Sequence, residues 1–133
     1  LDIARQNLTT LAKKSNSDIA AEAAYYTALI AFKNNDLKEC ERIINEILAA
    51  NYSSEYWYAS TFILYGDLYA ANGNLFQAKH TYQSIVDNYA GEDLKAVAQG
   101  KIDVIVAAEE AAQPKPQEEE ETPVPVTPNT EEE

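Results

Sequence analysis

The sequence has 133 residues, enough for one ordinary domain, and carries 22 acidic against 10 basic residues. The resulting net charge of −12 repels phosphate backbones, so we expect no nucleic acid partner. No apolar run approaches the roughly 20 residues of a membrane-spanning helix, so we expect no membrane insertion of this segment. The single cysteine excludes an internal disulfide and leaves the redox compartment open.

The chain begins with a predicted helix over residues 2–14, which ends in two lysines that suit the negative end of a helix dipole. Its pattern is that of the second helix of a hairpin whose first helix is missing, so we expect a fragment of a longer array. The segment Ser15–Asp18 is predicted to be a turn that caps the next helix. The apolar stripe of the first helix consists of Ile3, Ala4, Leu8, Leu11 and Ala12.

Five more helices follow from the spacing of the apolar residues, which gives about six in all. They are predicted over about 18–34, 37–50, 55–72, 75–89 and 92–112, with a loop over 51–54. Pro114 ends the last helix. The remaining segment, 113–133, contains all five prolines and seven glutamates but no aromatic residue, so we predict a disordered acidic tail.

The segment 54–90 is a helical hairpin around a single break. Gly73 suits a left-handed turn at the end of the first helix, because it has no Cβ to clash. Asn74 can then accept the free amide protons of the second helix, with Gln77 completing a capping box. The two apolar stripes meet across this hairpin.

A second copy of the hairpin precedes the first, at a shift of 38 residues that aligns Cys40 with Ala78. Under this shift Asn35 falls on Gly73, and Asp36, at the start of a further capping box, falls on Asn74. One helix–turn–helix per period of this size indicates a solenoid rather than a globular core. The predicted fold is therefore an all-α solenoid of antiparallel helical hairpins.

These residues resemble the tetratricopeptide repeat, whose signature places aromatic, small and glycine residues at fixed positions. In the second copy the matching repeat-packing residues are Phe62, Tyr65, Gly66, Tyr69, Gly73, Ala78 and Tyr82. The resemblance implies an array over 1–112 with units at 18–52 and 55–90, preceded by a second helix at 1–14 and followed by a capping helix at 92–112. Both units are longer than the usual 34 residues, which is similar to repeats of bacterial envelope proteins.

The resemblance also implies a concave groove, lined by the first helix of each unit, that binds a protein or peptide. Its predicted residues are Glu22, Tyr25, Leu29 and Phe32 from the first unit and Ser60, Ile63, Asp67 and Ala70 from the second. In the alternative interpretation, Tyr25, Leu29 and Phe32 only pack against the neighbouring unit. The basic clamp of chaperone-binding members is not matched, because Tyr25 and Leu29 stand where Lys and Asn would be needed.

Signals for catalysis, metal binding or a cofactor are poor, so we expect no enzyme and no cofactor. His80 is the only histidine and has no triad or metal pattern around it; a structural role is favoured. Cys40 occupies a small-residue position in a helix pair, where it acts as a small hydrophobe. Trp57 is expected to pack on the loop between the units rather than to be exposed.

Three functions remain open from the sequence. The first is a non-catalytic scaffold or adaptor for protein–protein interaction, and it is preferred. The second is a structural part of a bacterial envelope or outer-membrane assembly, and the third is an accessory segment of a longer enzyme. The compartment is unknown, with the bacterial envelope favoured over the cytoplasm by the length of the units.

Overall fold

The computed structural model describes the backbone of residues 2–113 and the side chains of residues 17–113. Within this part the chain forms five helices and no strand. They are α1 (Asp2–Lys33), α2 (Leu37–Ala49), α3 (Glu55–Ala71), α4 (Leu75–Asn88) and α5 (Glu92–Ala112). The all-α prediction is confirmed, whereas the predicted tail from residue 114 onward lies outside the described residues.

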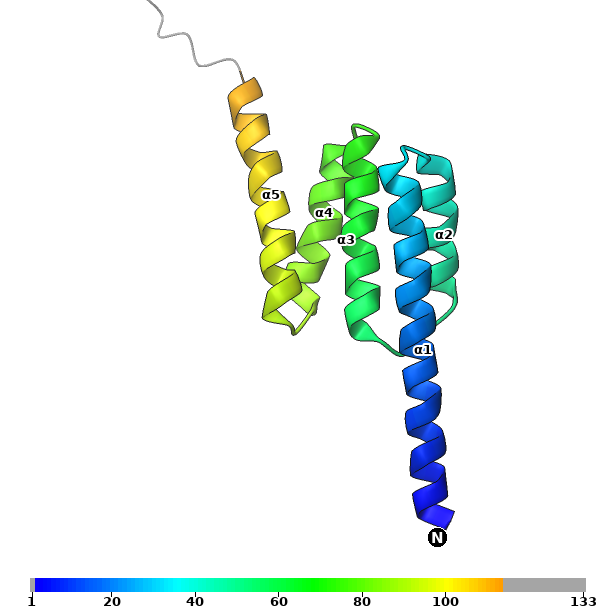
Figure 1. Cartoon of the computed structure of the whole chain (residues 1–133). Coiled ribbons are helices and arrows are strands. Elements are labelled where there is room, and N and C mark those ends of the chain that lie inside the picture. Colours follow the sequence, from blue (N-terminus) through cyan, green and yellow to red (C-terminus); the bar gives the residue numbers. More distant parts are fainter. Residues whose placement is uncertain (1, 114–133) are drawn as a thin grey trace, which may run out of the picture.

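The first helix differs from the prediction, because α1 runs without a break from Asp2 to Lys33. The turn predicted at Ser15–Asp18 is wrong, and residues 2–14 are not a separate helix, so the described part has five helices rather than about six. Serine, asparagine and aspartate cost only up to about 0.7 kcal/mol each in a helix interior, and no glycine or proline interrupts this segment. In Figure 1 the N-terminal part of α1 extends past the ends of the other helices.

The turn of each hairpin contains a residue in the left-handed conformation, as the sequence predicts. Asn35 has φ 60° and Gly73 has φ 80°. The next amide in each turn donates back to the last turn of the preceding helix: Asp36 N–H to the Ala31 carbonyl and Asn74 N–H to the Tyr69 carbonyl, both at 2.9 Å. This pattern satisfies carbonyl groups that the end of a helix leaves free, and it sets the reversal of the chain.

The capping boxes form only in part. The Asp36 carboxylate accepts from the Glu39 amide at 3.3 Å, and the Asn74 side chain accepts from the Gln77 amide at 3.2 Å. The predicted return bonds to the amides of Asp36 and Asn74 are absent, because those amides already donate to the preceding helix. The Glu39 carboxylate instead accepts from Arg42, its neighbour on the same helix face.

Two hydrophobic clusters lie on either side of α3, which is apolar on both faces. The first cluster lies between α1, α2 and α3 and consists of Ala28, Ala31, Cys40, Ile43, Ile44, Ile47, Leu64 and Leu68. The second lies between α3, α4 and α5 and consists of Ala59, Ile63, Ala78, Tyr82, Ile85, Leu94, Ala98, Ile102 and Ile105. The helix α3 therefore joins two layers that do not share a common core.

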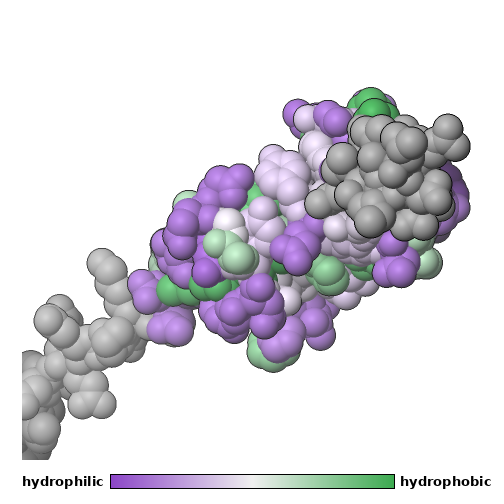
Figure 2. Space-filling view, turned by 90° about the horizontal axis from the view of Figure 1, so that it is seen from below, coloured by the Kyte–Doolittle hydropathy of each residue, from purple (hydrophilic) through white to green (hydrophobic). Residues whose placement is uncertain are grey.

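Each helix packs on its neighbour in the sequence, and α3 also contacts α1 and α5 (Figure 1). Among the described residues, α1 and α2 make no contact with α4 or α5. The helices thus form a row in which α1, α3 and α5 lie along one face. Figure 2 shows the end from which α1 projects, where hydrophilic side chains cover most of the visible surface and hydrophobic ones occupy small areas between them.

Apart from Gly73, which is exposed in the turn between α3 and α4, the predicted repeat-packing residues lie at the contacts between helices. Ala78 is fully buried, and Gly66 lies so close to Tyr82 that a Cβ on Gly66 would overlap the tyrosine ring. Phe62 and Tyr69 are half-buried against the cluster of α3, α4 and α5, whereas Tyr65 packs against the cluster of α1, α2 and α3. The small size of Gly66 and Ala78 lets α3 and α4 approach closely.

Candidate functional site

The helices α1, α3 and α5 line a hollow of about 330 Å³, which we call the inner hollow. Three residues of α1 line it: Tyr25, Tyr26 and Leu29. Five residues of α3 follow at helical spacing: Tyr56, Trp57, Ser60, Ile63 and Asp67. The wall opposite α1 comes from α5, with Leu94, Val97 and Lys101.

One side of the inner hollow is formed by four aromatic rings in contact with one another. The Trp57 ring lies at the centre of this aromatic cluster, with ring centroids 5.5 Å from Tyr25, 5.9 Å from Tyr26 and 4.8 Å from Tyr56. Such distances are those of favourable edge and tilted aromatic pairs. Tyr26 and Tyr56 remain 48% and 42% exposed, so a large part of the cluster is available to a ligand.

An ion pair between Asp67 of α3 and Lys101 of α5 closes the inner hollow on the side of α5. The Asp67 carboxylate accepts a hydrogen bond from the Tyr82 hydroxyl and lies 3.0 Å from the Lys101 amine. Burial and this hydrogen bond hold the pKa of Tyr82 far above its usual range. Because the single carboxylate and the single amine of the lining neutralise each other, apolar and aromatic surface dominates the inner hollow.

The predicted groove residues separate into two groups. Tyr25, Leu29, Ser60, Ile63 and Asp67 all line the inner hollow. The other three predicted groove residues do not line it. Ala70 lines a neighbouring hollow of about 490 Å³ against α5, Phe32 packs on the core of α1, α2 and α3, and Glu22 is exposed on α1.

The sequence interpretation missed the residues that give the inner hollow its aromatic character. Trp57 is half-buried rather than exposed, and the contacts of its ring with Tyr25 and Tyr26 on α1 were not predicted. The spacing of Tyr56, Ser60, Ile63 and Asp67 by four, three and four residues places them on one stripe of α3, and this signal could have included Tyr56 in the groove. The contribution of α5 was missed because this helix was interpreted only as a cap.

The single cysteine and the single histidine lie away from the inner hollow. Cys40 is fully buried, and burial raises the pKa of its thiol to about 11, so the reactive thiolate is disfavoured. His80 is exposed on α4. Across residues 17–113 no group of three or more His, Cys, Asp or Glu side chains is arranged to hold a metal ion.

Comparison with models of protein families, with curated proteins and with solved structures found no match to this chain. The resemblance to the tetratricopeptide repeat therefore depends on the sequence positions given above and stays a prediction. None of the described helices is both long and apolar enough to cross a membrane.

Proposed function

We propose that the chain is a tetratricopeptide-type module for protein–protein interaction, and that the inner hollow binds a segment of a partner protein. The observation that supports this most is the aromatic cluster of Tyr25, Tyr26, Tyr56 and Trp57. These rings come from two helices and meet on one face, and two of them are still nearly half exposed. Exposing this much aromatic surface to water costs free energy, which contact with a partner would recover.

Aromatic side chains suit this role because they bring a large contact area with few rotatable bonds. The rings of the cluster are also held in place by each other before any partner arrives. A preorganised surface loses less entropy on binding than a flexible one. The neutralised pair of Asp67 and Lys101 adds a polar boundary without presenting a free charge to the ligand.

The repeat interpretation is supported by equivalent packing positions at the shift of 38 residues. Cys40 and Ala78 are both fully buried, and Ile44 and Tyr82 are both buried in their clusters. Contacts restricted to neighbouring helices are those of a solenoid, in which each unit packs on the next. In such folds the first helix of each unit lines one extended surface, which is the arrangement of α1, α3 and α5 here.

A selection of random twelve-residue peptides displayed on phage tests this function. Trp57 is the only tryptophan of the chain, so its fluorescence reports directly on the inner hollow. We expect a class of selected peptides to change this fluorescence and to bind Tyr26→Ala about five- to thirtyfold more weakly, because an exposed aromatic anchor contributes about 1–2 kcal/mol. Phe76→Ala removes an even more exposed aromatic residue, which lies on α4 outside the inner hollow, and should leave binding unchanged.

The proposal is refuted if no selected peptide binds Tyr26→Ala more weakly than the parent, or if the selection yields no binding peptide. Trp57→Ala provides a second variant. It should abolish binding, and its circular dichroism must match that of the parent, since Trp57 is partly buried.

A further inference from the structure

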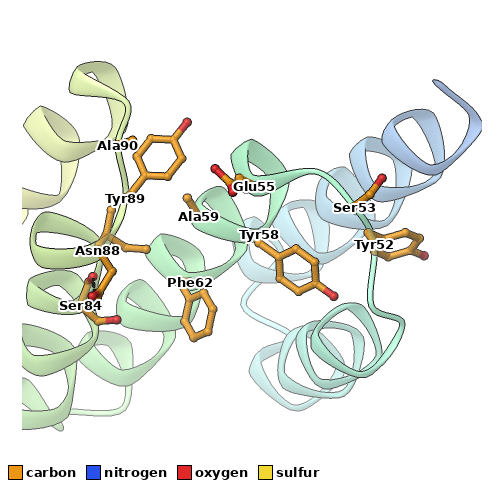
Figure 3. A pocket seen from close by; sticks show the side chains of 11 residues that line it. Tyr52, Ser53, Glu55, Tyr58, Ala59, Phe62, Ser84, Asn88, Tyr89 and Ala90 are labelled. Carbon is orange, nitrogen blue, oxygen red and sulfur yellow. Dashed lines mark hydrogen bonds between the residues drawn. The ribbon is translucent and has the colours of Figure 1, made fainter. Parts of the chain in front are cut away.

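A second hollow of about 480 Å³ lies on another face of α3, between the ends of α2 and α4; we call it the outer hollow (Figure 3). Its floor is a different stripe of α3, formed by Glu55, Tyr58, Ala59 and Phe62. The loop before α3 contributes Tyr52, and the end of α4 contributes Tyr89. In Figure 3 Glu55 lies between Tyr89 on the α4 side and Tyr58 on the α2 side.

The aromatic rings of the outer hollow are arranged differently from the aromatic cluster. Tyr52, Tyr58, Phe62 and Tyr89 all line it, yet among the described residues none of these rings is stacked on another ring. Their faces are therefore not already used in contacts between rings. The negative face of an aromatic ring attracts a cation placed within about 6 Å of it.

The charge around the outer hollow is negative and is not compensated. Glu55 is the only charged residue of the lining, and within residues 17–113 no basic side chain lies at ion-pair distance from it. Burial first, and then the neighbouring Asp93, Tyr56 and Glu55, raise the pKa of Tyr89, which agrees with a negative environment. The inner hollow differs, because its carboxylate is paired with Lys101.

Two helix ends add to this negative charge. The C-terminal ends of α2 and α4 flank the outer hollow, and neither helix has a basic residue in its last turn. Each such end carries about half a negative charge from the aligned peptide dipoles. The N-terminal end of α3 also lies here and carries about half a positive charge, which offsets part of the Glu55 charge. The sum of these contributions stays negative.

We propose that the outer hollow is a second binding site, whose occupant is a lysine or arginine side chain on a segment of a partner protein. The aliphatic stem of that side chain would pack on Phe62 and Tyr58, and its cationic group would lie beside Glu55 and the tyrosine rings. The rim residues Ser53, Glu55, Asn88 and Ala90 are exposed, so the hollow is open. An open hollow suits a side chain that projects from a larger partner better than a small ligand, which pockets usually enclose.

The test uses the full chain and a phage-displayed library of random twelve-residue peptides, selected at low salt. Selected peptides are assayed against Glu55→Gln and Tyr58→Leu, which alter the outer hollow, and against Tyr26→Ala, which alters the inner one. Glu92→Gln is the charge-matched control, because it also removes one carboxylate from the first turn of a helix but does not line the outer hollow. Arginine amide and spermidine serve as small cationic competitors.

We expect a class of peptides rich in lysine or arginine that binds Glu55→Gln and Tyr58→Leu about tenfold more weakly than the parent. Their affinity for Glu92→Gln and Tyr26→Ala should be unchanged, and it should fall as salt is raised because salt screens the charges. Replacing the basic residue of the peptide with glutamine should cause a similar loss. Circular dichroism of each variant checks that it is folded.

Other results overturn this proposal while separating it from the proposed function. Basic peptides that depend on Tyr26 but not on Glu55 would place the occupant in the inner hollow, which supports the proposed function and refutes the second site. A selection that yields only peptides without a basic residue, or basic peptides that all bind Glu55→Gln and Glu92→Gln equally, would also refute it. Displacement of the peptides by arginine amide or spermidine at the peptides' own concentration would show a site for small amines instead.

Discussion

Gly66 and Gly100 are both glycines inside helices, and replacing each with alanine should change stability in opposite directions. A helical glycine costs about 0.5–1 kcal/mol relative to alanine, so both substitutions gain this amount from the backbone. At Gly100, on the exposed side of α5, a new Cβ has no atom within 4 Å apart from its chain neighbours and the backbone of its own helix. We therefore expect Gly100→Ala to stabilise the protein by about 0.5–1 kcal/mol.

At Gly66 the new methyl group has no space. Its Cβ would overlap the Tyr82 ring, with two ring atoms at 2.8 Å, which is well inside van der Waals contact. The ring cannot move away easily, because Tyr82 is buried and its hydroxyl donates to Asp67. Overpacking of this kind costs about 1–3 kcal/mol, and a rigid, tethered ring places Gly66→Ala at the upper end. After the backbone gain, a net loss of about 2 kcal/mol remains.

Urea unfolding followed by circular dichroism at the helix band measures both variants under the same conditions. In thermal unfolding, the same loss of about 2 kcal/mol corresponds to a melting temperature about 8–16 °C lower for a domain of this size. The circular dichroism of the folded state should be the same for both variants and the parent. The variants should therefore differ only in the urea concentration at the midpoint of unfolding. If Gly66→Ala were as stable as Gly100→Ala, the close approach of α3 and Tyr82 would be wrong.

Two further predictions concern buried side chains. The pKa of Cys40 is raised to about 11 from an ordinary value of 9.0, so its contribution to stability is present below pH 9 and is lost as the pH rises toward 11. Urea unfolding at pH 8 to 10.5 should therefore show a smaller alkaline loss for Cys40→Ala than for the parent; equal losses would contradict this. Tyr82→Phe keeps the ring but removes the bond to Asp67, and should cost about 1–2 kcal/mol in the same assay at pH 7. A variant as stable as the parent would show that this bond contributes nothing.

The hairpins could be predicted from the sequence because their signals are local. Gly73 and Asn35 tolerate positive φ better than other residues, and Asp36 and Asn74 can accept from the free amides of the next helix. These properties depend only on a few neighbouring residues. The starts of α2 and α4 can therefore be predicted from the local sequence. The unbroken helix α1 could not be predicted in the same way. The residues of Ser15–Asp18 are typical of a helix cap or turn when considered alone. In the structure they continue the helix that lies on both sides of them.

The candidate site was predictable only in part, because it combines helices that are distant in sequence. The stripe of Tyr25 and Leu29 was found from its place in the repeat. That the ring of Trp57 lies against Tyr25 depends on how α3 crosses α1, which no local pattern determines. The outer hollow was missed for a related reason. It forms where the ends of α2 and α4 stay apart, and a gap between elements leaves no signal in either sequence segment.

The shape of the inner hollow depends on the position of α5, because this helix forms one of its walls. Two ion pairs hold α5, from Lys101 to Asp67 at 3.0 Å and from Lys79 to Glu109 at 2.7 Å. Both are partly exposed, and such pairs contribute at most about 1 kcal/mol each. The buried residues of α5 must therefore supply most of the attachment, and the first of them, Leu94, itself lines the inner hollow. The wall beside the aromatic cluster is thus fixed by core packing, so a partner meets a surface that is already in place.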